Sequence, residues 1–82
     1  MNIKRITQPE EFTTSDLYLA AFLAAQKQPL LRVDRKNGRV YFIFPDVQRT
    51  RELRSQFFNN GTVSVGDFRR SLQDLKTLIF ST

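Results

Sequence analysis

Nine consecutive apolar residues, Leu17 to Ala25, form the longest such run in this chain of 82 residues. Leucine and alanine are the strongest helix formers, and no glycine, proline or β-branched residue interrupts the run. Pro29 ends the helix because its ring cannot continue one and because it disfavours helical geometry at the residue before it. We therefore predict a central helix over residues 14–27. A helix that is apolar all round is normally buried on more than one side.

The start and the two sides of this helix can also be predicted. Thr13 and Asp16 have the spacing of a capping box, which satisfies the free amides of the first turn. At about 100° per residue, the helix has a bulky side and an alanine-rich side. The bulky side consists of Tyr18, Leu19, Phe22 and Leu23. We expect it to fill the core with Phe42, Phe44, Phe68 and Leu72. The alanine side should allow close approach of another helix or a neighbouring subunit.

A membrane span is the alternative interpretation of an apolar run. Nine residues, however, cover only about 13 Å of a hydrocarbon core that is roughly 30 Å thick. We therefore expect no membrane span. The N-terminal residues Met1 to Arg5 lack the apolar segment of a secretory signal, so we expect a cytoplasmic protein.

The dipeptide Asn37-Gly38 lies between two runs of extended type. It strongly indicates a β-hairpin, because a two-residue type I′ turn needs positive φ at both positions. We predict an antiparallel hairpin over residues 30–44 with this turn, whose register follows from it. The face toward the helices then comprises Leu31, Val33, Val40, Phe42 and Phe44. The outer face comprises Arg32, Asp34, Lys36, Arg39, Tyr41 and Ile43.

Two more helices follow the hairpin. Asp46 is predicted to cap a helix over residues 47–59, and an Asn-Asn-Gly sequence stops that helix. Ser64 has the spacing of a capping-box residue for a last helix over residues 65–80. The apolar stripe of this last helix consists of Val65, Phe68, Leu72, Leu75 and Ile79.

These elements predict one small α+β domain in the order α-β-β-α-α. The chain is too short for two hydrophobic cores. We expect the domain to occupy residues 12–82, after a partly ordered N-terminal arm at residues 1–11 that is polar and lacks periodicity.

A resemblance to a known family rests on three parts of the chain. They are Thr13 to Leu23, Gly38 to Phe44, and a closing set formed by Phe68, Leu75-Lys76 and Ile79-Phe80. In these parts the sequence resembles a family of short prokaryotic and viral proteins that is catalogued as a domain of unknown function. The resemblance covers nearly the whole chain from Thr13 onward. Its positions are mostly caps and core, so it implies a fold and no active site.

The composition excludes the commonest catalytic machinery. The chain has no cysteine and no histidine, which removes thiolate chemistry, the commonest general base and the commonest metal ligand. Three aspartates, Asp16, Asp46 and Asp67, lie at predicted helix starts, where capping explains them. The three glycines are isolated and form no phosphate-binding loop. We therefore expect a non-catalytic protein with no metal and no cofactor.

The chain is basic, with 13 Lys and Arg against 8 Asp and Glu and a net charge of +5. This charge permits binding to nucleic acid, an anionic membrane or an acidic protein, and it is equally compatible with a solvated surface that binds none of them. A helix-turn-helix formed by the last two helices is disfavoured. The final helix presents only Arg69, Arg70 and Gln73 outward, near its start.

The outer face of the hairpin is the strongest candidate site. Its cations suit phosphates and its tyrosine suits stacking on a base, so we predict nucleic-acid binding. The residues predicted to bind are Arg32, Lys36, Arg39 and Tyr41. A plain solvent face is one alternative, with Asp34 paired to Arg32 or Lys36. In the other alternative, exposed Tyr41 and Ile43 beside two open strand edges bind a second copy, as a homodimer, or another protein.

Overall fold

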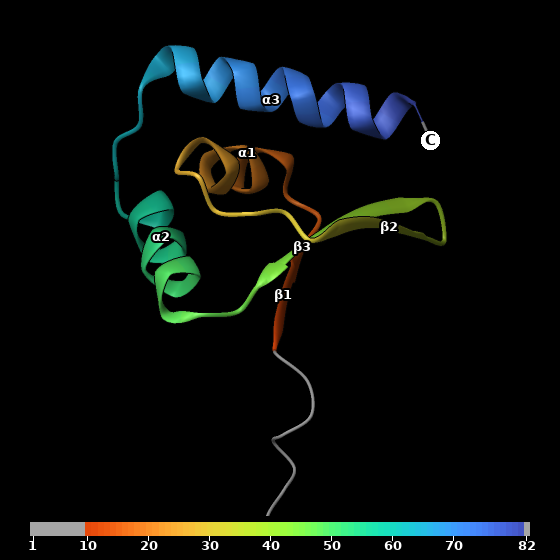
Figure 1. Cartoon of the computed structure of the whole chain (residues 1–82), viewed down its shortest axis with the longest axis horizontal. Coiled ribbons are helices and arrows are strands. Elements are labelled where there is room, and N and C mark those ends of the chain that lie inside the picture. Colours follow the sequence, from red (N-terminus) through yellow and green to blue (C-terminus); the bar gives the residue numbers. More distant parts are fainter. Residues whose placement is uncertain (1–9, 82) are drawn as a thin grey trace, which may run out of the picture.

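A computed structural model describes residues 10–81 and shows a three-stranded sheet with three helices, in the order β-α-β-β-α-α (Figure 1). The elements are β1 (Glu11–Thr14), α1 (Leu17–Ala25), β2 (Arg32–Lys36), β3 (Arg39–Pro45), α2 (Gln48–Phe58) and α3 (Val65–Phe80). The α+β class and the predicted helices and hairpin are confirmed. The first strand was not predicted.

Strand β1 corrects the boundary of the N-terminal arm. Glu11, assigned to the arm, pairs with Pro45, and the carbonyl of Glu10 accepts a hydrogen bond from the amide of Asp46 at 3.0 Å. The prediction for residues 1–9 lies outside the described part of the chain. Strand β1 was not predicted because it spans only four residues. Its pairing partner lies about 30 positions later, and local sequence patterns do not indicate so distant a contact.

The sheet is antiparallel in the order β1-β3-β2, so β3 is its central strand. The predicted hairpin register is confirmed from Lys36 opposite Arg39 to Arg32 opposite Ile43. The turn is also confirmed, because Asn37 and Gly38 have φ values of 53° and 79°. Strand β1 pairs only with the second half of β3. The hairpin therefore continues beyond β1 as a two-stranded ribbon.

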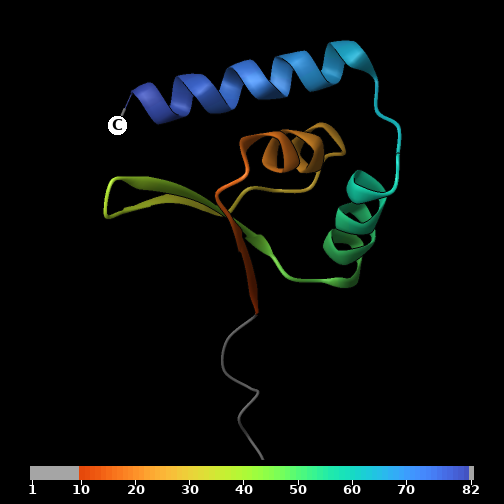
Figure 2. The same ribbon diagram turned by 180° about the vertical axis from the view of Figure 1, so that it is seen from behind.

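Helix α1 occupies the centre of the domain. In Figures 1 and 2 it lies between α3 and the sheet, with α2 at one end. Its alanine side packs as predicted, since Ala20 and Ala21 are fully buried and small side chains allow neighbouring elements to approach closely. The other core residues from α1, the sheet, α2 and α3 are Leu19, Phe22, Leu23, Phe42, Phe44, Leu53 and Leu75.

Two details of the predicted α1 are wrong. The helix begins after Asp16, whose carboxylate accepts hydrogen bonds from the amides of Tyr18 and Leu19 at 2.9 and 3.1 Å. Thr13 is instead part of β1. Tyr18, assigned to the core, is 57% exposed. A buried tyrosine needs a hydrogen-bond partner for its hydroxyl, and exposure in the first turn of the helix supplies water.

The end of α1 is tied to two other elements by a buried chain of hydrogen bonds. Lys27 has a positive φ of 68°, which reverses the chain after the helix. The side-chain amide of Gln28 donates to the hydroxyl of Thr50 on α2 at 2.6 Å. That hydroxyl donates to the carbonyl of Pro45 on β3, also at 2.6 Å. Both polar side chains are buried and hydrogen-bonded, which fixes α2 against the sheet.

Helices α2 and α3 lie within one residue of their predicted ranges. The predicted cap of α3 is confirmed, since the Ser64 hydroxyl accepts from the amide of Asp67 at 3.5 Å. The predicted cap of α2 is wrong. Its N-cap position is Val47, one residue after Asp46, and the Asp46 carboxylate pairs with Arg51 at 3.1 Å instead.

Two residues assigned to the core lie at its margin. Val65 starts α3 beyond the end of the core and is 74% exposed. Leu31 precedes β2 and is 48% exposed, although its amide donates to the carbonyl of Ile43. The rest of the stripe packs against the core through Phe68, Leu72, Leu75 and Ile79. Within residues 10–81, no helix is long and apolar enough to cross a bilayer.

Candidate nucleic-acid interface

The outer face of the hairpin is a ladder of opposed side chains. From the turn inward, Lys36 faces Arg39, Asp34 faces Tyr41 and Arg32 faces Ile43. Successive side chains on one face of a strand are about 6.8 Å apart, and opposed Cβ atoms are about 4.5–5.5 Å apart. The hairpin extends to the side of the molecule opposite α2, with the end of α3 over its inner face (Figures 1 and 2). The outer face therefore points away from all three helices.

Two cations face each other at the end of the ribbon. Lys36 and Arg39 are both exposed, and neither forms an ion pair with any residue that the structure describes. Like charges directly opposite each other on a sheet are destabilising. A third cation, Arg35, lies on the inner face and donates to the carbonyl of Ile79 at the end of α3. The end of the hairpin is thus a concentrated patch of positive charge.

Arg32 is engaged differently from the two cations of the turn. Its guanidinium donates two parallel hydrogen bonds to the Glu11 carboxylate, both at 2.9 Å, and a third to Asp34 at 3.4 Å. These hydrogen bonds, which Arg32 donates and Glu11 accepts, lower the pKa of Glu11 and raise the pKa of Arg32. The Arg32–Asp34 pair was expected if the face were only solvated. Arg32 thus links β1 to β2. Two carboxylates balance its positive charge, which makes it a weaker phosphate ligand than Lys36 or Arg39.

Ile43 is not the exposed residue that the sequence predicted, because it is only 2% exposed. The cause is β1, which was not foreseen. Thr13 lies beside Ile43 on one side and Arg32 on the other, and Arg32 reaches across β3 to Glu11. Ile43 therefore offers almost no surface to a second copy or another protein, and the edge of β3 beside it is occupied by β1. Tyr41 remains partly exposed.

The outer face is hollowed around the second rung of this ladder, which is the pair of Asp34 and Tyr41. This concavity is lined by Thr13, Arg32, Asp34, Lys36, Tyr41 and Ile43. It combines a ring, a carboxylate, a hydroxyl, two cations and an apolar side chain, contributed by all three strands. The hydroxyl of Tyr41 makes no hydrogen bond with any described residue, so it is available to a ligand. Of these residues Thr13 was missed, although alternation in the sequence Glu-Phe-Thr-Thr and its threonines are typical of a strand.

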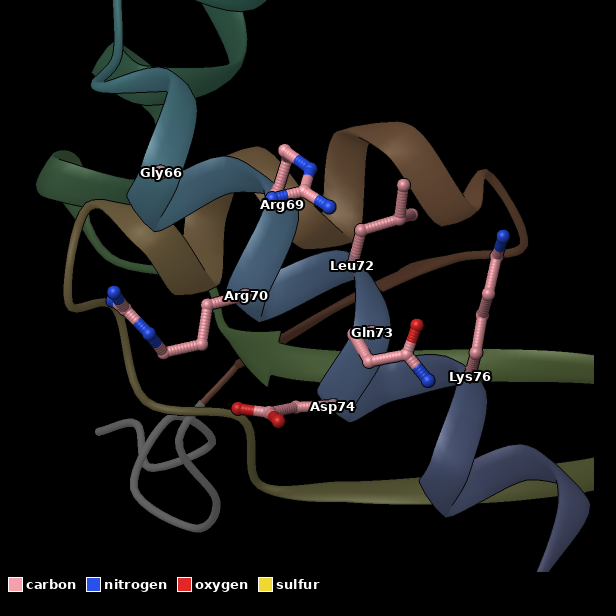
Figure 3. A pocket seen from close by; sticks show the side chains of 7 residues that line it. All are labelled: Gly66, Arg69, Arg70, Leu72, Gln73, Asp74 and Lys76. Carbon is pink, nitrogen blue, oxygen red and sulfur yellow. The ribbon is translucent and has the colours of Figure 1, made fainter.

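A second concavity lies along α3 (Figure 3). Its lining comprises Gly66, Arg69, Arg70, Leu72, Gln73, Asp74 and Lys76. Arg69, Arg70 and Gln73 do point outward, as predicted. Arg70 is paired with Asp67 at 3.1 Å, and Asp74 adds a negative charge. All the lining residues come from one helix, so no second element fixes them for a ligand.

The arginines of α2 are largely engaged within the fold. Arg51 pairs with Asp46 at 3.1 Å, and the guanidinium of Arg54 lies 4.2 Å from the centre of the Phe12 ring, a cation–π contact that holds β1 to α2. Among residues 10–81, no group of three His, Cys, Asp or Glu side chains is placed to hold a metal ion. Within the described part of the chain, the hairpin thus combines two cations that have no ion pair, Lys36 and Arg39, with a partly exposed aromatic ring.

The Glu11–Arg32 pair predicts a pH dependence of stability. The folded pKa of Glu11 lies below its usual value of 4.5, so the unfolded chain binds this proton more readily than the folded chain. The contribution of the pair is therefore complete above about pH 4.5 and is lost as pH falls through the lowered pKa. We expect the difference in unfolding free energy between wild type and Glu11→Gln to shrink over this range, as measured by urea titration. A difference that is constant from pH 6 to pH 2.5 would contradict this.

A family model described as "Domain of unknown function (DUF5659)" matches residues 9–81 of the 82. The resemblance inferred from the caps and core positions is confirmed. No curated protein and no solved structure matches the chain.

Proposed function

The chain belongs to this family of unknown function, and we propose that it is a small non-catalytic module that binds nucleic acid through the outer face of its hairpin. The observation that carries the proposal is the opposed pair Lys36 and Arg39, which has no carboxylate partner among residues 10–81. Two neighbouring phosphates of one strand, bound at these two cations, would relieve the repulsion between them. Tyr41 lies one rung further along, where its ring can stack on a base of the same strand.

Several observations support a non-catalytic role. The chain has no histidine or cysteine to act as base or nucleophile. Asp16 caps α1, and Asp46 and Asp67 are ion-paired with arginines, so these carboxylates have structural partners. Asp34 is the one acid among the residues that line the concavity on the hairpin, and the neighbouring Glu11 is held by Arg32.

The salt dependence of binding tests the proposal. A mixed-sequence, fluorescein-labelled single-stranded DNA of 12 nucleotides is titrated with the protein at 50 and 200 mM NaCl, and binding is followed by anisotropy. Two phosphates neutralised by Lys36 and Arg39 give a slope of about −1.4 for log affinity against log salt. We therefore expect affinity to fall by about sevenfold between the two conditions. Absence of binding at 50 mM, or affinity that salt does not change, would overturn the proposal.

Self-association or binding of another protein is the alternative function. It has less support, because Ile43 is buried and β1 covers the inner half of the edge of β3. The most exposed large apolar side chains, Val65 and Phe80, lie at opposite ends of α3 and form no single patch. Isolated exposed apolar residues are ordinary on a monomer. A dimeric mass in light scattering that persists at 500 mM NaCl would favour this alternative.

A further inference from the structure

The second rung of the hairpin ladder determines what kind of nucleic acid the face accepts. We infer that its concavity takes one unpaired base whose edge carries two adjacent N–H donors, the arrangement found on the Watson–Crick edge of guanine. The preferred ligand is then single-stranded nucleic acid that contains guanine. This inference rests on the proposed function, since the phosphates of the same strand would lie on Lys36 and Arg39.

Asp34 excludes a phosphate from the second rung. It faces Tyr41 directly, and its side chain is half exposed. An ionised carboxylate can only accept hydrogen bonds and repels anions. The Nε of Arg32 holds one carboxylate oxygen at 3.4 Å, which orients the group while the other oxygen has no partner among the described residues. The rung therefore needs a ligand that presents donors.

A nucleobase can present such donors, whereas the phosphate backbone of a nucleic acid cannot. The Tyr41 ring offers a stacking surface, and Ile43 and Thr13 bound the same concavity from the central strand and β1. Strand β1 closes the concavity on one side, and the opposed cations lie about 6.8 Å away along the ribbon. The space between β1 and these cations suits one base, and the phosphates that flank this base would lie toward the turn.

The chemistry of the carboxylate selects among the bases. Guanine presents an imino and an amino donor side by side, which match the two oxygens of a carboxylate. Adenine and cytosine present one amino group beside a ring nitrogen that is an acceptor. Thymine and uracil present one imino group between two carbonyl oxygens, which a carboxylate repels. In a duplex the Watson–Crick edge of guanine is already paired, so the site requires a single strand.

The test compares four DNA strands of nine nucleotides at 50 mM NaCl by anisotropy. All positions are thymine except the central one, which is guanine, adenine, cytosine or thymine. We expect the strand with guanine to bind wild-type protein about tenfold more tightly than the all-thymine strand, because a bidentate pair contributes about 1–3 kcal/mol of discrimination. The same guanine placed in a duplex should lose this advantage.

The variant Asp34→Asn assigns the preference to the carboxylate. We expect it to bind the guanine and thymine strands with affinities within about twofold of each other, and to bind the thymine strand at least as well as wild type. Asp74→Asn on α3 removes the same charge elsewhere and should keep the preference. Circular dichroism confirms that each variant folds.

The outcomes separate this inference from the proposed function. Equal affinity of wild type for all four strands, or a guanine preference that survives in Asp34→Asn, would overturn the inference and leave the electrostatic binding proposal standing. Absence of binding to every strand at 50 mM NaCl would overturn both.

Discussion

Replacing Phe22 with alanine is expected to lower the free energy of unfolding by about 3–5 kcal/mol. Phe22 lies at the middle of α1, is 3% exposed, and its ring centre is 5.5 Å from that of Phe57 on α2. Its removal leaves a cavity where α1 meets the rest of the core. Small domains have a total stability of roughly 5–15 kcal/mol, so this single change removes a large fraction of it. Urea titration followed by circular dichroism measures the loss.

The matched control is Tyr18→Ala, four residues earlier on the same helix. The sequence pattern put both rings on the core side of α1, whereas Tyr18 is 57% exposed. We therefore expect a change within about 0.5 kcal/mol for Tyr18→Ala. Losses of similar size in the two variants would show that the orientation of α1 described above is wrong.

Reversing the two cations of the turn is expected to weaken nucleic-acid binding by about tenfold or more at 50 mM NaCl. The variant Lys36→Glu/Arg39→Glu removes two phosphate contacts and adds repulsion in their place, so the salt slope should become shallower by about 1.4. The fold should be unaffected, because both side chains are exposed and one pair of opposed like charges replaces another. The anisotropy titration used for wild type measures the change.

The control variant carries the same change in charge at a different place. Lys27→Glu/Arg49→Glu reverses two exposed cations that form no ion pair among residues 10–81, one after α1 and one on α2. Both variants reduce the net charge from +5 to +1. If overall charge alone drives binding, the two variants lose affinity equally, and the hairpin has no special role. We expect the control to lose no more than about threefold.

The hairpin shows how much of this fold local chemistry determines. Asn37-Gly38 forces a two-residue turn, and that turn sets every pair from Lys36 opposite Arg39 inward. The faces of the ribbon were therefore predicted correctly. The ranges of α2 and α3 were also predicted to within one residue, because the Asn-Asn-Gly stop after α2 and the Ser64 cap of α3 act within a few residues. Helix caps were less reliable where adjacent polar residues compete, as Asp46 does with Val47.

Contacts between distant segments could not be predicted in the same way. Strand β1 gains its pairing from β3, about 30 residues later, and a four-residue strand gives little pattern of its own. Without β1, Ile43 was predicted to lie on the surface, and Arg32 was given no partner on a neighbouring strand. Both errors concern the candidate site: the sequence placed Lys36, Arg39 and Tyr41 on the outer face but could not show that Arg32 pairs with Glu11.

Chemical-shift mapping tests the central claim most directly. The protein is labelled with ¹⁵N and titrated with the nine-nucleotide strand that carries the central guanine, at 50 mM NaCl, and amide shifts are followed. The proposal predicts that the largest changes fall on residues 32–43 of β2, the turn and β3, with little change from Arg69 to Lys76 on α3. Changes concentrated on α3, or no changes anywhere at this salt concentration, would contradict binding through the hairpin.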